Sequence, residues 1–418
     1  MNPLRQKIEQ EIREYGPIPF SRYMELCLYH PELGYYSRNA EQFGKAGDFY
    51  SSSDVHAVFG HLLARQFEEM WHALGSPQQI DLLELGPGRG LFAHDVLDWS
   101  EKKFPDFFRA LRYVLVESSA ALRKRIKETL LRHLESGKAW CEPEVFSREK
   151  VGKGATSVVP KQAPKDRALA PEVPVIVFAN EFFDALPVEI VSGKGSLRVD
   201  TRDGRFIESW VHPSPDELEF LDRYSVHPDS GERLEAPLAA QQFMDRIAAR
   251  IQRGFILVID YGYTREEQLA GRHRGTLKAL RQHSVSGNSY EAPGEQDITA
   301  DVNFTALAAA VEKHGMQTQK LITQSQFLMG IGEANQFADA FEECRLPQER
   351  AKVALQLKHL VTPAGMGESF QVLIASKGVE RERAESLSGL NFGRSSPALL
   401  NRRKSTKSLS FRTGRQAE

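Results

Sequence analysis

Short apolar runs alternate with amphipathic segments along most of the chain. The apolar runs, rich in Val, Ile and Leu, predict strands at 80–85, 113–117, 173–179, 255–260 and 370–376. Segments with apolar positions at helical spacing predict helices at 91–103, 120–136, 237–253 and 304–314. Strands that alternate with helices are typical of a mostly parallel sheet covered on both faces, so we predict an α/β, Rossmann-like fold.

Parts of the chain depart from this alternation. Residues 1–75 predict helices at 3–15, 19–29 and 54–74, and we interpret them as an N-terminal helical cap with a covering loop. Within the core, assigned to 76–376, residues 148–174 predict a flexible insertion. Residues 190–235 predict a second insertion that contains a β-hairpin, whose turn is Asp203-Gly204. Residues 377–418 have few apolar anchors and predict a disordered basic tail.

Composition narrows the function classes. The 418 residues are 41% hydrophobic and 26% charged, which is typical of a globular chain. The formal net charge of -2 offers no basic field for nucleic acid, and we expect no nucleic-acid partner. The predicted tail is the exception, with ten basic and four acidic residues, and a solvated tail is the simpler interpretation.

The cysteines and the apolar runs suggest a compartment. Cys27, Cys141 and Cys344 form no close pair, so neither a disulfide framework nor a zinc ribbon is predicted. No HExxH motif or close His/Cys cluster is present, and we expect no metal site. No apolar run is long enough to cross a bilayer, and the first residues resemble neither a signal peptide nor a transit peptide. We therefore expect a cytoplasmic, bacterial protein without membrane insertion.

The sequence Glu84-Leu-Gly-Pro-Gly-Arg-Gly stands where a predicted strand meets a predicted helix. Gly86, Gly88 and Gly90 let the backbone turn sharply and let a ligand approach it closely. The spacing is G-x-G-x-G and departs from the G-x-G-x-x-G of dinucleotide-binding folds. Glu84 would place a carboxylate where S-adenosylmethionine offers its ammonium group, whereas it would repel a pyrophosphate. An ordinary Gly-rich turn is the alternative.

Glu117 ends the next predicted strand. In Rossmann-like sheets an acid at this place accepts hydrogen bonds from both ribose hydroxyls of a nucleoside. A solvent-exposed acid is the alternative.

The sequence Asn180-Glu-Phe-Phe-Asp-Ala-Leu-Pro follows a third predicted strand, whose carboxyl end faces the ligand edge of such a sheet. Methyl transfer from a sulfonium requires alignment of donor and acceptor beside carbonyl and aromatic groups, for which Asn180, Glu181 and the two Phe are suitable residue types. As alternatives, the two Phe serve only as core packing and Asp184 caps a following helix.

Several sequence segments together resemble the MidA family of class I S-adenosylmethionine-dependent methyltransferases. The matching segments are Gly16-Pro-Ile-Pro-Phe, Tyr29-His-Pro-Glu-Leu-Gly-Tyr-Tyr, Gly47-Asp-Phe-Tyr-Ser-Ser, the Glu84 and Asn180 motifs, Ile259-Asp-Tyr-Gly, the segment 293–302 and Met366-Gly-Glu-Ser-Phe-Gln-Val-Leu. They occur in order between residue 16 and about residue 376. The family includes a mitochondrial protein arginine methyltransferase needed for the assembly of respiratory complex I.

The resemblance implies a class I methyltransferase fold, S-adenosyl-L-methionine as cofactor, and a protein substrate such as a respiratory complex I subunit. It implies that Gly86, Gly88 and Gly90 lie under the cofactor, Glu117 on its ribose, and Asn180 with Glu181 near the methyl group. In the cap it suggests that Gly47, Asp48 and Ser51 close over the cofactor.

This chain departs from the family pattern at a few positions, where Ser53, Asp54, Ser118 and Ala120 replace the usual residues. Asp301 stands where histidine is common, so the role of that position is left open.

An arginine acceptor stays protonated in water, so a methyltransferase must orient it with carboxylates. The candidates are Glu181, Asp184, Asp260 and Asp297, of which Glu181 is the predicted guanidinium ligand. Turn or capping duty is the alternative for Asp260 and Asp297.

We therefore predict a methyltransferase that uses S-adenosyl-L-methionine, with Asn180, Glu181 and Asp184 as catalytic residues. Asp48, Ser51, Glu84, Gly86, Gly88, Gly90, Glu117 and Asn180 are the predicted cofactor-binding residues. Two alternatives stay open: a non-catalytic assembly factor with this fold that binds a partner protein, and a nicotinamide oxidoreductase. The sequence also leaves open whether the chain forms a homodimer.

Overall fold

The computed structural model describes residues 2–37, 57–144, 173–281, 284–286, 288–363 and 365–393. Residues 148–172 of the predicted insertion and 394–418 of the predicted tail lie outside the described residues. Asp48 and Ser51, with Gly47, Ser53 and Asp54 of the predicted covering loop, also lie outside them.

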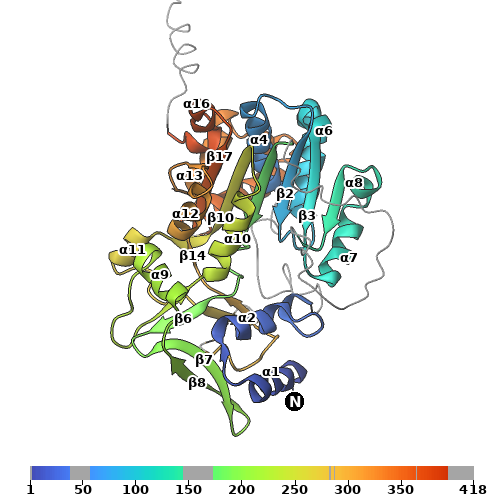
Figure 1. Ribbon diagram of the computed structural model, residues 1–418. Coiled ribbons are helices and arrows are strands. Elements are labelled where there is room, and N and C mark those ends of the chain that lie inside the picture. The colour runs from blue at the N-terminus through green and yellow to red at the C-terminus, as the bar shows by residue number, and fades with distance from the viewer. Residues whose placement is uncertain are drawn as a thin grey trace, which may run out of the picture.

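A mostly parallel sheet forms the core of the upper part of Figure 1, as the α/β prediction required. Its strand order is β15-β17-β10-β5-β2-β3-β4, and β14 and β16 pair with β10 and β17. The strands from β4 to β10 run parallel, whereas β17 is antiparallel to β10. The bounds are β2 Ile80–Leu85, β3 Leu111–Val116, β4 Ala139–Glu142, β5 Val175–Asn180, β10 Gly254–Tyr263, β14 Val302–Asn303, β15 Gln317–Thr318, β16 Ile322–Thr323 and β17 Phe370–Lys377.

The order of these strands places a crevice in the sheet. From β2 the chain passes to β3 and β4 on one side, and it then returns to β5 on the other side of β2. Ligands of open α/β sheets bind at such a switch point, beyond the carboxyl ends of the strands.

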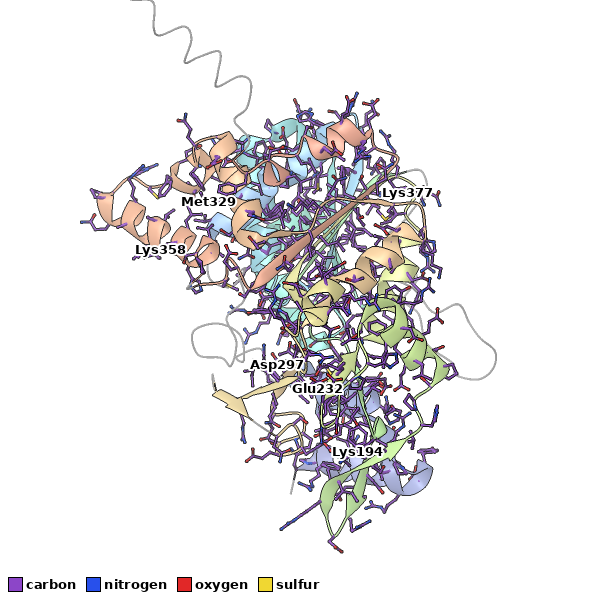
Figure 2. The ribbon with its side chains drawn as sticks, turned by 90° about the vertical axis from the view of Figure 1, so that its left-hand side faces the viewer. Lys194, Glu232, Asp297, Met329, Lys358 and Lys377 are labelled. Carbon is purple, nitrogen blue, oxygen red and sulfur yellow. The ribbon has the colours of Figure 1, made fainter. Side chains whose placement is uncertain are left out.

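Helices cover both faces of the sheet because its strands bury both of their faces. Leu82 packs in one apolar cluster and Leu83, the next residue, packs in the other. The first cluster includes residues of α4 (Ala57–Ala73), α5 (Leu91–Lys103), α6 (Pro105–Ala110), α7 (Ala120–Thr129), α13 (Gln324–Ala334), α14 (Ala338–Phe341) and α15 (Pro347–Val361). The second includes residues of α10 (Leu238–Ala248) and α12 (Phe304–Glu312). In Figure 2, α15 with Lys358 projects from the side of the molecule.

A second, antiparallel layer lies below the main sheet in Figure 1. The predicted hairpin forms β7 and β8, and β1 from the N-terminal region pairs with β7 through Ile18 and Val199. Helices α1 and α2 pack on this layer with a separate apolar cluster. The bounds are α1 Pro3–Tyr15, β1 Ile18–Pro19, α2 Phe20–Tyr29, η1 Tyr35–Ser37, β6 Glu189–Ser192, β7 Gly195–Arg202, β8 Arg205–Val211, α9 Pro215–Tyr224, β9 Arg233–Ala236, α11 Arg265–Leu269, β11 Lys278–Arg281, β12 Ser284–Ser286 and β13 Asp297–Thr299. How these layers divide into domains stays a prediction.

Local sequence signals account for several element ends. Helix α1 begins after Asn2, whose Oδ1 accepts the N–H of Leu4 at 2.9 Å, and it ends at Gly16 with φ +85°. Ser214 and Glu217 form a capping box at the start of α9. The strands at 80–85 and helices at 3–15 and 91–103 have the predicted bounds. The helix predicted at 120–136 is divided in two, α7 and α8 (Leu131–Glu135), at Leu130.

The segment 377–393 differs from its prediction. Its composition predicts disorder, but it forms α16 (Arg381–Glu385) and η3 (Ser388–Leu390). Ala384 and Leu387 are buried in the main core, and Gly389 donates its N–H to Gln66 Oε1 at 3.0 Å. Two buried apolar side chains are enough to order this segment, because they pack on a core that other elements have already formed.

None of the helices in the described ranges is both long and apolar enough to span a membrane.

Gly254 provides a test of the close contact between β10 and β5. It has φ +153°, and a Cβ built there would lie 1.9 Å from the carbonyl oxygen of Val175. We expect Gly254→Ala to lower the free energy of unfolding by about 3 kcal/mol, because backbone atoms must move apart. Urea unfolding measures this change. Gly193→Ala is the control, since no atom lies within 4 Å of its Cβ position; an equal loss there would contradict the explanation.

Candidate active site

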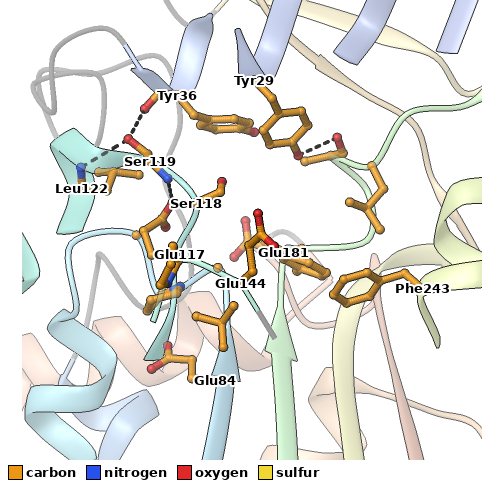
Figure 3. Close-up of a pocket in the computed structure, with 18 of the residues that line it drawn as sticks. Tyr29, Tyr36, Glu84, Glu117, Ser118, Ser119, Leu122, Glu144, Glu181 and Phe243 are labelled. Carbon is orange, nitrogen blue, oxygen red and sulfur yellow. Dashed lines mark hydrogen bonds between the residues drawn. The ribbon is translucent and has the colours of Figure 1, made fainter. Parts of the chain in front are cut away.

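A cavity of about 1220 Å³ lies beyond the carboxyl ends of β2, β3 and β5. The loops that follow these strands form one side of it, and Tyr29 and Tyr36 of the N-terminal region form another. In Figure 3 their rings lie across the cavity from Glu181, with Glu117 on one side and Phe243 on the other. The switch point of the sheet therefore coincides with a real cavity.

The glycine loop has the geometry that its spacing predicts. Gly86, Gly88 and Gly90 have φ values of +63°, +55° and +77°, which residues with a Cβ rarely adopt. A Cβ on Gly86 would lie 2.8 Å from Cδ2 of Phe182. Gly90 directly precedes α5, so the backbone at the start of that helix faces the cavity region. The three glycines thus keep their positions in this loop free of side chains and form a cradle for a ligand, which we call the glycine cradle.

Glu84 lies at the end of β2 and is 4% exposed. Its Oε2 accepts the hydroxyl of Tyr113 at 2.8 Å. Burial raises the pKa of Glu84 to about 8, although the Tyr113 hydrogen bond opposes this shift. The carboxyl group lines the cavity and favours a cation there.

Glu117 follows β3 and is 6% exposed. Its Oε1 accepts the N–H of Ser119 at 2.7 Å. Burial raises the pKa of Glu117 to about 7, while backbone N–H groups and the nearby Arg123 lower it. The predicted alternative of a solvent-exposed acid does not describe this residue.

The loop after β5 brings Asn180 and Glu181 to the same cavity. Asn180 Nδ2 donates to Glu181 Oε1 at 3.1 Å, and Asn180 Oδ1 is buried without a hydrogen-bond donor among the described residues. Glu181 has φ +50°, in the left-handed region that costs a non-glycine residue about 1–2 kcal/mol. Such strain is found at functional sites more often than elsewhere.

Asp184 lies deeper in this loop. Its Oδ2 accepts the hydroxyl of Thr299 at 2.9 Å, and burial raises its pKa to about 6. No helix follows Asp184, so the capping alternative is wrong. The alternative that both Phe serve only as core packing holds for Phe183, which is buried. It does not hold for Phe182, which lines the cavity and contacts Phe243.

Asp260, in the last part of β10, is fully buried. Its Oδ2 accepts the backbone N–H groups of Phe182 and Phe183 at 3.1 and 2.9 Å, and that of Asp184 at 3.4 Å. Burial and then repulsion by Asp184 and Glu181 raise the pKa of Asp260. It contacts the loop and does not line the cavity.

The N-terminal region supplies site residues that had no predicted role. Tyr36 donates its hydroxyl to Asp297 Oδ1 at 3.0 Å, and its carbonyl accepts the hydroxyl of Ser119 at 2.8 Å. Tyr29 donates its hydroxyl to the carbonyl of Ala185 at 2.9 Å. The segment Tyr29–Tyr36 stood among the family motifs, which was the only signal for it in the sequence.

The predicted site residues divide into three groups. Eight of them line one cavity, and Gly90 ends the glycine loop beside it; the eight are Glu84, Gly86, Gly88, Glu117, Asn180, Glu181, Asp184 and Asp297. Asp48 and Ser51 lie outside the described residues. Asp301 does not line the cavity and contacts His273 Nδ1 at 3.2 Å and Lys278 Nζ at 3.3 Å. The individual roles in catalysis and cofactor binding stay predictions.

Metal chemistry has no candidate centre in this region. Over the ranges that the structure covers, no group of three or more His, Cys, Asp or Glu residues could hold a metal ion.

Residues 62–322 match the family model described as "Putative S-adenosyl-L-methionine-dependent methyltransferase". The chain belongs to this methyltransferase family. A protein arginine methyltransferase NDUFAF7 homolog, mitochondrial, from Drosophila melanogaster is 31% identical over 90% of this chain and 85% of its own. The protein arginine methyltransferase NDUFAF7, mitochondrial, from Homo sapiens is 27% identical over 88% of this chain and 82% of its own.

A solved structure agrees with the family assignment. A protein from Burkholderia thailandensis, crystallised with S-adenosyl-homocysteine, is 27% identical, with a TM-score of 0.74 over 94% of each chain. The methyltransferase therefore has the class I fold, and its cofactor is S-adenosyl-L-methionine.

The cavity fits this cofactor. The glycine cradle leaves room for a ligand against the backbone, and the buried Oδ1 of Asn180 is available for a donor. Glu84 and Glu117 have carboxyl groups of the kind that bind ammonium and hydroxyl groups. We expect these residues to hold the cofactor, with Glu117 on its ribose.

The raised pKa of Glu117 predicts how cofactor affinity depends on pH. In the free protein the carboxyl ionises near pH 7, and hydrogen bonds from ribose hydroxyls favour the ionised form. We expect the ionisation of Glu117 by itself to raise the affinity for S-adenosyl-homocysteine about tenfold between pH 6 and pH 8. Calorimetric titrations across this range measure it.

Two variants separate the two acids. Glu117→Gln should lose this tenfold rise and keep only the rise that follows the ionisation of Glu84, whose pKa of about 8 is higher. Glu84→Gln should retain the tenfold rise. An unchanged pH profile in Glu117→Gln would contradict the ribose assignment.

Proposed function

We propose that this methyltransferase transfers a methyl group to a guanidinium nitrogen of a protein arginine. The observation that carries the proposal is that Glu181 and Asp184 both line the cavity, and that Glu181 lies opposite the rings of Tyr29 and Tyr36 (Figure 3). Carboxylates beside aromatic faces are suited to a flat cation. The names of the relatives as protein arginine methyltransferases support the same substrate class.

The chemistry requires orientation and proton removal. When bound, the cofactor supplies an electrophilic methyl group on its sulfonium. In the proposal, Glu181 accepts guanidinium N–H groups and draws their positive charge, so that one nitrogen lone pair faces the methyl group. Asp184, with a pKa of about 6, accepts the proton that leaves the methylated nitrogen, directly or through water.

The acceptor protein is proposed from the family resemblance. A subunit of a respiratory complex is the proposed class of substrate, and a cytoplasmic location is the proposed compartment.

Substitution of Glu181 tests the role of its carboxylate. Glu181→Gln keeps the shape of the side chain and removes its charge, so we expect about a 100-fold lower rate of methyl transfer. Affinity for S-adenosyl-homocysteine should change much less. The assay uses isotope-labelled cofactor and a lysate from a strain that lacks the gene, followed by mass spectrometry of modified peptides.

Methylarginine in the labelled peptides is the expected product. Label on another residue type would overturn the arginine assignment. Cofactor binding without transfer to any protein would instead favour the non-catalytic assembly factor. Normal turnover by Glu181→Gln would contradict its role as guanidinium ligand.

A further inference from the structure

The Asp260 carboxylate contacts the site loop but not the cavity. One of its oxygens accepts three consecutive backbone N–H groups, from Phe182 to Asp184, and the other accepts the N–H of Tyr261 at 2.9 Å. The side chain is fully buried and is absent from the residues that line the cavity. Asp260 therefore cannot touch a substrate without a rearrangement.

The loop that it contacts needs such support. Residues 181–188 form neither helix nor strand, so no regular ladder satisfies their N–H groups. Glu181, the first residue of the loop, has the strained φ of +50°. Its N–H donates to the carbonyl of Ile259 at 3.0 Å, directly before Asp260. The end of β10 thus binds the backbone on both sides of the Glu181 Cα.

We propose that Asp260 is a positioning residue, which holds the turn of residues 181–184 so that the Glu181 carboxylate faces the transferred methyl group. The inference rests on the proposed role of Glu181. An oxygen shared by three N–H donors fixes the path of the loop in a way that a neutral side chain reproduces only in part. Without it, Glu181 relaxes from its strained conformation and its carboxylate moves.

The test uses ligand affinity and needs no acceptor protein. Sinefungin is an analogue of the cofactor that carries a cationic amine in place of the sulfonium methyl group. Its affinity relative to S-adenosyl-homocysteine therefore reports how close a carboxylate lies to the methyl position. Calorimetry gives this ratio for the wild type, Glu181→Gln, Asp260→Asn and the double variant.

We expect Glu181→Gln and Asp260→Asn each to lower the ratio about tenfold, which is the size of one lost charge-assisted hydrogen bond. The double variant should be no lower than Glu181→Gln alone, because Asp260 acts only through Glu181. If Asp260→Asn does not fold, Asp260→Glu retains the charge but displaces the carboxylate, and the same ratio is expected to fall.

Glu235→Gln is a matched control. Glu235 is 2% exposed and accepts the N–H groups of Thr276 and Leu277, but it does not line the cavity. Glu235→Gln should lower the thermal stability of the protein about as much as Asp260→Asn does. It should leave the affinity for sinefungin relative to S-adenosyl-homocysteine unchanged.

The outcomes separate the two claims. An unchanged ratio in Glu181→Gln would show that Glu181 is not beside the methyl group, and the proposed function would lose its guanidinium ligand. A fall in Glu181→Gln with no fall in Asp260→Asn, or with fully additive effects, would overturn the positioning role alone. An equal fall in Glu235→Gln would mean that the ratio reports general stability, and would also overturn it.

Discussion

The carboxyl edge of the main sheet holds acids whose negative charge is costly because they are buried. Burial raises the pKa of Glu84, Glu117 and Asp184, because ionised carboxylates lose their hydration there. Backbone N–H groups stabilise part of this charge, as for Glu117 and Asp260. A cationic ligand stabilises more of it. The sulfonium and ammonium groups of the cofactor are such cations, and a guanidinium is another.

The N-terminal region connects the two sides of this acidic cavity. Tyr36 is hydrogen-bonded to Ser119, which lies beside the proposed ribose ligand Glu117, and to Asp297. Tyr29 is bonded to Ala185, in the loop that carries the proposed acceptor residues. A movement of this region would therefore change the cofactor side and the acceptor side together.

The sequence predicted the parts of the site that short-range patterns determine. Apolar runs located β2, β5 and β10, and the parallel order implied that Glu84, Glu117 and Asn180 would meet at one edge. The glycines predicted a sharp turn, and the positive φ values of Gly86, Gly88 and Gly90 agree with that prediction. The family resemblance then predicted the methyltransferase, which the comparisons confirmed.

Contacts between distant segments could not be predicted in this way. Tyr36 and Asp297 are 261 positions apart, and their hydrogen bond depends on how the antiparallel layer sits on the main sheet. The contacts of Asp260 could not be predicted from the sequence either. The sequence offered Asp260 both as a candidate guanidinium ligand and as a turn residue. Its three N–H donors face it only because the site loop curves around the end of β10. The ordered segment after β17 depends likewise on a core already formed by other elements.

A crystal structure with bound S-adenosyl-homocysteine will show how the buried acids and the site loop meet the cofactor. We expect the ribose hydroxyls on the Glu117 carboxylate, the backbone of the glycine loop against the ligand, and the sulfur directed toward Glu181. A ligand bound away from Glu117, or a sulfur directed away from the loop that carries Glu181, would contradict this expectation.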